Sequence, residues 1–262
     1  MSGAFVSAQT IGTSARHMEQ GSWRVVTFYE AVNEEELDFD IEAIDSCTAE
    51  TGTAGAFPCG GNRLGLGSGE SFNAKLLYQP GERMQYYVSL GAGNYRLRTA
   101  SVTVTNSLSG DRVGFRYGAG FKTLIMSETI VTPAVALDAG ISMERYFFNR
   151  LAPVIAAGDE SIDERLDLQR IQIAIEASKR FKISDAVTLE PYGGLKWIRT
   201  QSWIKDLASG GRRGGVHNTA SPFVGLSAPI FGNEGFFAEA SFVDGIRYAL
   251  GLTIGFGSNE KK

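Results

Sequence analysis

The chain has 262 residues, of which 43% are hydrophobic and 21% are charged, with a formal net charge of −4. This balance argues against a nucleic-acid-binding protein, which usually concentrates basic residues on one face. No apolar run approaches the roughly 20 residues that a membrane-spanning helix needs. A transmembrane β-strand escapes this test, because only every second residue of such a strand faces lipid.

The first 22 residues follow no sustained pattern. The stretch from Phe5 to Ile11 can be interpreted as a further strand, as a plug or as a flexible leader. We therefore assign residues 1–22 to a leader or periplasmic segment, or to an extra strand.

From residue 23 onward the chain repeatedly alternates large apolar residues with small or charged ones. Val113, Phe115 and Tyr117, for example, alternate with Gly114 and Arg116. Successive side chains of a strand point to opposite faces, so this alternation predicts β-strands. We place ten strands at residues 23–33, 71–79, 84–97, 112–126, 131–146, 168–183, 187–204, 219–231, 236–243 and 246–256.

The polar faces of these strands mix glycine, alanine and serine with isolated charges of both signs. Small residues and paired charges suit the crowded interior of a narrow closed barrel, whereas the purely apolar faces suit contact with lipid. We expect these charged side chains to form a network in the lumen: Arg112, Arg116, Lys122, Asp138, Glu144, Arg170, Glu176, Arg180, Glu190, Lys196, Glu239 and Arg247.

The pattern predicts an all-β fold, a closed antiparallel up-and-down transmembrane β-barrel at residues 23–257. Closure is obligatory in lipid, because an open sheet edge would leave backbone groups unpaired. We expect about ten strands, and eight or twelve also fit. Short turns at 80–82, 127–129, 184–186 and 232–235 lie at one end, and long outward loops at 34–70, 98–111, 147–167 and 205–218 lie at the other.

This fold predicts a bacterial outer-membrane location. The opening residues, Met1 to Phe5, lack the basic region and apolar core of a secretory signal peptide. We therefore expect that such a peptide has been removed.

Cys47 and Cys59 lie in one predicted outer loop, which favours a disulfide over two free thiols in an oxidising compartment.

An acidic run from Glu34 to Asp40 precedes them. It lacks the glycine and the final glutamate of a calcium loop, so we interpret it as an extended rim strand with a solvated face. We expect no metal and no cofactor.

Only two histidines could support hydrolytic chemistry. His17 lies in the unplaced first segment, and His217 lies in a predicted loop near Ser209 and Ser221, with no defined pairing. We interpret His217 as an ordinary solvated residue.

Arg212 and Arg213 in the same loop are candidates for contact with lipopolysaccharide phosphates, because arginine pairs with phosphate through two parallel hydrogen bonds.

The last strand resembles the C-terminal strand of outer-membrane barrels, and the segments 86–93 and 117–122 resemble strands of small OmpA-, OmpW- and opacity-type barrels. The resemblance covers most of residues 70–257, and it implies that the barrel-assembly machinery recognises the final strand. The residues that carry this signal are Tyr248, Leu250, Leu252, Ile254 and Phe256. The pattern departs from the family in that a tail, residues 258–262, follows.

The favoured function is a non-enzymatic envelope protein whose outward loops bind a partner, and which conducts small solutes weakly at most. A barrel of about ten strands is too narrow for a general porin, which needs about 16. One alternative is a hydrolase at the outer rim that uses His217 on lipid or peptide. Another is a structural subunit that contacts an envelope partner through residues 1–22. The expected partners are outer-membrane lipid, lipopolysaccharide and the assembly machinery, and not nucleic acid.

Overall fold

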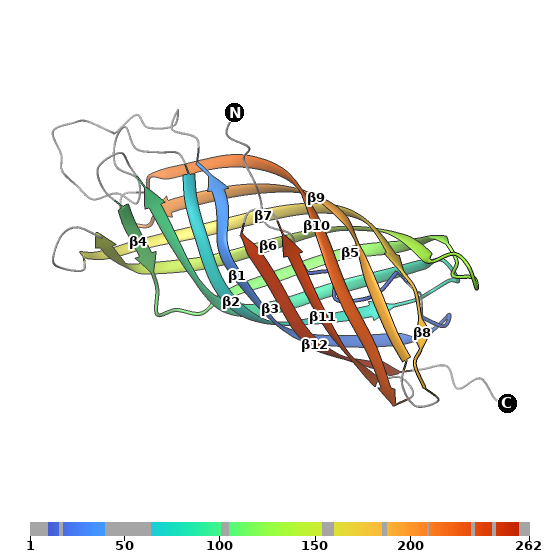
Figure 1. The fold of residues 1–262 in the computed structure, drawn as a ribbon. Coiled ribbons are helices and arrows are strands. Elements are labelled where there is room, and N and C mark those ends of the chain that lie inside the picture. Colours follow the sequence, from blue (N-terminus) through green and yellow to red (C-terminus); the bar gives the residue numbers. More distant parts are fainter. Residues whose placement is uncertain are drawn as a thin grey trace.

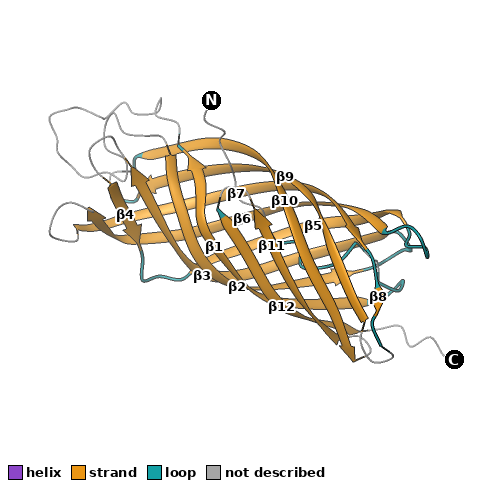
Figure 2. Cartoon of the chain, in the orientation of Figure 1, coloured by secondary structure: helices purple, strands orange, loops and turns teal. Residues whose placement is uncertain are grey.

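The chain forms a tilted, elongated cylinder of strands in the computed structural model (Figure 1). The structure describes residues 10–15, 18–39, 64–100, 105–153, 160–184, 188–208, 210–231, 234–242 and 245–256. Strands and loops make up this described part, without a helix (Figure 2). Accordingly, no helix there is long and apolar enough to cross a membrane.

Twelve strands are present in the described residues. They are β1 (Trp23–Asp38), β2 (Leu64–Tyr78), β3 (Met84–Ala100), β4 (Thr105–Ser109), β5 (Gly114–Met126), β6 (Ala134–Pro153), β7 (Glu160–Ser178), β8 (Phe181–Lys182), β9 (Thr188–Asp206), β10 (Arg212–Phe231), β11 (Glu234–Phe242) and β12 (Ile246–Phe256).

The strands close into one antiparallel ring with ten positions. The short β4 and the longer β5 share the position between β3 and β6, and the two-residue β8 pairs only with one end of β9. The ring closes where β1 pairs with β12, from Trp23 opposite Phe256 to Asn33 opposite Ile246. The predicted closed up-and-down barrel is therefore confirmed.

Several strands are longer than predicted at the end that carries the long loops. β6 reaches Pro153 and β7 begins at Glu160, so most of the predicted loop 147–167 is strand. Likewise, β10 begins at Arg212, inside the predicted loop 205–218. The prediction ended these strands too early because the apolar face changes there from the outside to the inside of the barrel, which hid the continued alternation.

β7 shows this reversal most clearly. From the short-turn end to the loop end, its outward side chains are Ile175, Ile173, Ile171, Gln169, Asp167, Arg165 and Asp163. Over the same stretch, its inward side chains are Glu176, Ala174, Gln172, Arg170, Leu168, Leu166 and, last, the buried Glu164. The strand thus changes from apolar outside and charged inside to polar outside and apolar inside.

The loop end of the barrel consequently has an ordinary hydrophobic core. Buried leucine, isoleucine and aromatic side chains from six strands fill it, together with one residue that follows β1. They are Leu37, Phe39, Tyr95, Leu97, Leu108, Tyr146, Phe148, Leu151, Leu166, Leu168 and Ile204. A charged exterior around an apolar core is typical of a protein surface in water, whereas the apolar exterior of the other half suits lipid.

A β-bulge near the loop end of β1 resets which side chains face inward. The register with β2 shifts between Val32 and Glu35, and Glu34 there has a φ of 60°. One extra residue reverses the inside–outside alternation. Glu30 before the bulge and Glu35 after it both point inward, and each is 0% exposed. The acidic run was predicted to be a rim strand with a solvated face; Glu34, Glu36 and Asp38 lie on that face, whereas Glu35 lies on the opposite, buried face.

The polarity reversal on β7 predicts a sharp positional dependence for an added charge. Ile173→Lys places an ammonium on the outward apolar face, and we expect it to lower the unfolding free energy by about 2–4 kcal/mol in lipid bilayers. Gln169→Lys, on the same face nearer the loop end, should cost at most about 1 kcal/mol. If urea titrations gave equal losses of unfolding free energy for the two variants, the boundary between the lipid-facing and water-facing parts of β7 would be wrongly placed.

Candidate functional site

The structure places ten of the twelve predicted network residues inside the barrel, where all are buried. The other two expectations are wrong. Arg112 lies exposed in the turn before β5, and Arg180 follows the end of β7, where its Nε lies 3.1 Å from Oε2 of Glu128. Both were assigned inward because the alternation was extended past the true strand ends.

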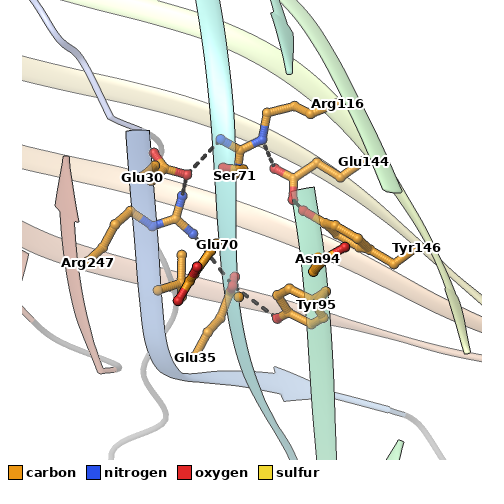
Figure 3. Close-up of a pocket in the computed structure, with 12 residues that line it drawn as sticks. Glu30, Glu35, Glu70, Ser71, Asn94, Tyr95, Arg116, Glu144, Tyr146 and Arg247 are labelled. Atoms are coloured by element: carbon orange, nitrogen blue, oxygen red, sulfur yellow. Dashed lines mark hydrogen bonds and ion pairs between the residues drawn. The ribbon is translucent and has the colours of Figure 1, made fainter. Parts of the chain in front are cut away.

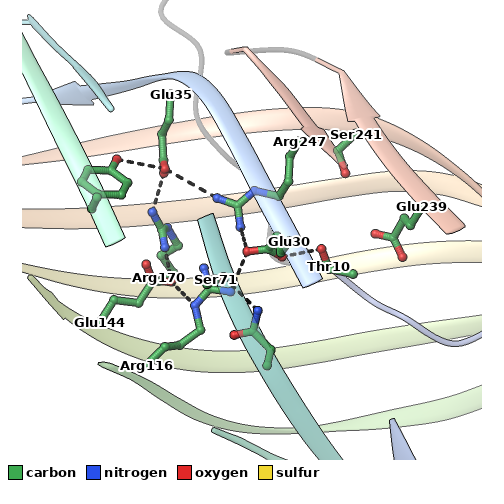
Figure 4. Close-up of polar contacts among 12 residues, drawn as sticks. Thr10, Glu30, Glu35, Ser71, Arg116, Glu144, Arg170, Glu239, Ser241 and Arg247 are labelled. Atoms are coloured by element: carbon green, nitrogen blue, oxygen red, sulfur yellow. Dashed lines mark hydrogen bonds and ion pairs between the residues drawn. The ribbon is translucent and has the colours of Figure 1, made fainter. Parts of the chain in front are cut away.

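Six buried side chains form a closed ring of alternating charge across the lumen, the Arg–Glu ring (Figure 4). In order around the ring they are Glu30, Arg116, Glu144, Arg170, Glu35 and Arg247. Each carboxylate contacts two arginines and each arginine contacts two carboxylates. The three positive and three negative charges therefore cancel within one layer.

The geometry of the ring is tight. Glu30 Oε1 lies 2.7 Å from Arg116 Nη1 and 2.8 Å from Arg247 Nη1. Arg116 Nε lies 2.7 Å from Glu144 Oε1. Arg170 contacts Glu144 and also Glu35, whose Oε2 lies 3.5 Å from Arg247 Nη2. Because a buried charge is costly unless it is paired, this closed arrangement makes each member depend on its neighbours.

Two tyrosines border the ring on its loop side. Tyr95 donates from its hydroxyl to Glu35 Oε2 at 3.1 Å, and Tyr146 donates to Glu144 Oε2 at 3.0 Å. Their rings stack with centroids 4.6 Å apart. A cavity of only about 10 Å³ lies among these side chains (Figure 3), room for about one water molecule. The ring therefore fills its cross-section of the lumen.

A second charged layer, the lysine layer, lies between the Arg–Glu ring and the short turns. Its members are Lys75, Lys122, Lys196, Asp138, Glu176 and Glu239, all buried. Two direct ion pairs hold it, Lys122 Nζ to Glu176 Oε1 at 2.5 Å and Lys196 Nζ to Glu239 Oε1 at 2.6 Å. Tyr87 donates to Asp138 Oδ1 at 3.0 Å, and Lys75 Nζ lies 4.3 Å from the centre of the Tyr87 ring.

Residues 10–15, the lumen segment, lie inside the barrel against this layer. They form no strand, so the described part of residues 1–22 is not the extra strand that we considered. Lys75 and Lys122 donate to carbonyl groups of the segment, and Glu239 accepts from two of its backbone amides. Thr10 reaches Glu30 of the Arg–Glu ring (Figure 4).

Sequence reasoning missed three network residues. Glu30 and Lys75 lie within predicted strands, on the face shared with the buried Phe28 and Leu77, and the alternation there would have placed them inside. Glu35 shares its face with the buried Leu37 and Phe39, so the alternation beyond the bulge also carried a signal for it.

His217 is a strand residue and not the solvated loop residue that we predicted. It lies in β10, is 4% exposed, and its Nδ1 is 2.5 Å from Asp38 Oδ2. Its Nε2 has no hydrogen-bond partner. Ser221 does not pair with it but donates from Oγ to the carbonyl of Phe242 at 3.0 Å.

Several predicted residues lie outside the described part of the chain, namely Cys47, Cys59, His17 and Ser209, as does the side chain of Arg213. The disulfide stays a prediction. Arg212 is exposed, and its guanidinium carbon lies 4.9 Å from the centre of the Trp203 ring. Among the described side chains, no group of three or more acidic, histidine or cysteine residues is placed to hold a metal ion.

The five residues of the predicted assembly signal all lie on the outer face of β12. Tyr248, Leu250, Leu252, Ile254 and Phe256 are exposed there, in the half of the barrel that has an apolar exterior. The tail, residues 258–262, lies outside the described part.

The chain matches no known protein-family model, and no curated protein matches it by sequence. Among solved structures, the outer-membrane protease OmpT of Escherichia coli matches with a TM-score of 0.50 and 10% identity, over 93% of this chain and 100% of that one. OprG of Pseudomonas aeruginosa matches with a TM-score of 0.43 and 11% identity, over 94% and 100%. The translocator domain of NalP from Neisseria meningitidis matches at 0.44 and 13%, over 93% and 91%.

The likeness to OmpT concerns the fold alone. Together with the closed ring of strands, it establishes that this chain has the fold of the small outer-membrane β-barrels, as the resemblance of its strands implied.

The closed Arg–Glu ring predicts that one missing arginine is costly. Arg170→Met leaves Glu35 and Glu144 each with a single arginine, and we expect a loss of about 3–5 kcal/mol in unfolding free energy. Arg180→Met removes an arginine outside the barrel and should cost about 0–1 kcal/mol. Urea titration of the two variants checks this, and a small loss for Arg170→Met would show that the ring does not act as a unit.

Proposed function

We propose that this protein is a non-enzymatic outer-membrane barrel with a closed lumen, whose outer half stands outside the bilayer and displays a binding surface. The observation that carries the proposal is the combination of the Arg–Glu ring with the polarity reversal just above it. The ring removes the water path, and the reversal provides a charged outer surface on rigid strands. Binding through that surface is the function that this arrangement favours.

The same arrangement supports an outer-membrane location. The apolar exterior of the short-turn half matches the hydrocarbon layer, and OmpT, which shares the fold, is an outer-membrane protease. The outward residues of β12 are positioned for recognition by the barrel-assembly machinery, which reads alternating apolar residues that end in an aromatic, here Phe256.

Lipopolysaccharide is the partner that the surface chemistry favours. Arg96 on β3, Arg199 on β9 and Arg212 on β10 point outward and are exposed beyond the apolar exterior. On β9, Arg199 is the next outward residue after Trp197. Guanidinium groups just beyond the apolar exterior are suited to the phosphates of a lipid headgroup layer.

The structure gives a hydrolase less support. A histidine that acts as a general base needs a nucleophile within hydrogen-bond reach, and His217 Nε2 has no such partner. We expect detergent-solubilised wild type and the His217→Ala variant to hydrolyse fluorogenic peptides and phospholipids at the same background rate. Activity that the wild type has and this variant loses would instead support the rim hydrolase.

The closed lumen predicts a specific combination of gel and electrical behaviour. The unheated protein should migrate faster than the heated protein, because a lipid-embedded barrel stays folded in detergent, and it should pass no current in planar bilayers. Discrete conductance steps in the wild type would move transport ahead of surface binding. A protein that is soluble without detergent and shows no heat shift would refute the membrane assignment.

A further inference from the structure

The lumen segment is bound in a way that depends mainly on its backbone. Five of its seven hydrogen bonds to the barrel involve its own main-chain amides or carbonyls. Glu239 accepts from the amides of Ile11 and Gly12 at 3.1 and 2.9 Å. Lys75 donates to the carbonyl of Ile11 at 2.8 Å. Such contacts recognise the main chain whatever side chains it carries.

A few side-chain positions add selectivity. Ile11 is 1% exposed and packs in an apolar pocket formed by Ala174, Tyr192 and Phe223. Gly12 has a φ of +68°, and a Cβ on it would lie 3.2 Å from Cζ of Phe237, so this position favours glycine.

The C-terminal part of the segment is equally restricted. Ala15 is 0% exposed and packs in a cluster of small side chains with Ala134 and Ala136. The barrel therefore accommodates an uncharged stretch with an apolar anchor followed by small residues.

Space beside the segment leaves a route for exchange. A cavity of about 420 Å³ is lined by Gly12, Thr13 and Ser14 of the segment. Trp23 and Phe256, which mark the short-turn ends of β1 and β12, line the same cavity. The segment can withdraw into this volume without breaking any strand pairing, because it belongs to no strand.

We propose that the lysine layer is a binding site for an uncharged peptide, which residues 10–15 fill in cis and which a peptide from another chain can fill in their place. The barrel then has two binding faces, one at the outer rim and one that is reached from the short-turn end. Tethering gives the cis segment a high effective concentration, so an added peptide has access only when the cis segment is weakened.

The test uses the full-length protein and a fluorescent peptide with the sequence of residues 10–15. Ile11→Asp puts a carboxylate into the pocket of Ala174, Tyr192 and Phe223 and should release the cis segment, because an unpaired charge is costly there. Ile11→Val is the matched control that keeps the segment in place. We expect saturable binding, measured by fluorescence anisotropy, to the Ile11→Asp barrel and none to the control or the wild type.

The peptide itself supplies a second comparison. A peptide that carries the Ile11→Asp change should bind the released barrel at least about tenfold more weakly. If the Ile11→Asp barrel is folded, as shown by its heat shift, and binds neither peptide or both equally, the proposal is overturned and the segment is only a structural filler.

A different variant covers failure of Ile11→Asp to fold. Ser14→Cys is combined with Gly12→Ala, a milder change that weakens the cis segment because Gly12 has a φ of +68°, and it places a thiol on that segment, where labelling by a bulky maleimide should be slow. Excess peptide should raise the labelling rate at that position about tenfold relative to the wild-type background, because displacement exposes the thiol. An unchanged rate at saturating peptide concentration overturns the proposal independently of the first variant.

Discussion

Charge pairing inside a narrow lumen is the constraint on which most of this structure depends. The Arg–Glu ring draws one or two members from each of β1, β5, β6, β7 and β12. An ion without a partner at such a site costs several kcal/mol, so the strands are held at the tilt and register that keep each carboxylate between two arginines. The planar guanidinium suits this role because it presents donors to two partners at once.

The two charged layers differ in what their cations do. In the Arg–Glu ring, the guanidinium groups are engaged with carboxylates of the barrel itself. In the lysine layer, Lys75 and Lys122 also donate to carbonyl groups of the lumen segment. A compact ammonium with three donors can serve a carboxylate and a backbone group together. One layer is therefore complete without the N-terminal segment, and the other is completed by it.

The sequence predicted the barrel and much of its interior, and the failures have physical causes. Arg116, Lys122 and Glu144 could be assigned because alternation is unbroken around them. Arg112 and Arg180 were misplaced because alternation says little about where a strand ends. His217 was taken for a loop residue because its strand passes from an apolar to a polar exterior.

Two further features were missed for different reasons. A one-residue bulge shifts the alternation of β1, so Glu35 is in phase with the buried Leu37 and Phe39 and out of phase with Glu30, and its side had to be read separately beyond the bulge. The lumen segment is bound largely through its main chain, which is the same for every residue type except proline.

The bulge in β1 also limits which changes in chain length this barrel tolerates. Glu30 and Glu35 are five positions apart, an odd spacing that would put them on opposite faces of a regular strand. Loss of one residue at the bulge would make the spacing four, so both carboxylates would still face inward on a regular strand, and Val32 and Glu35 would keep their β2 partners. Gain of one residue would instead require a larger bulge, or else the strand beyond it would slip against β2 and turn Glu36 and Asp38 toward the core. Homologues of this barrel should therefore tolerate a shorter chain at this point better than a longer one.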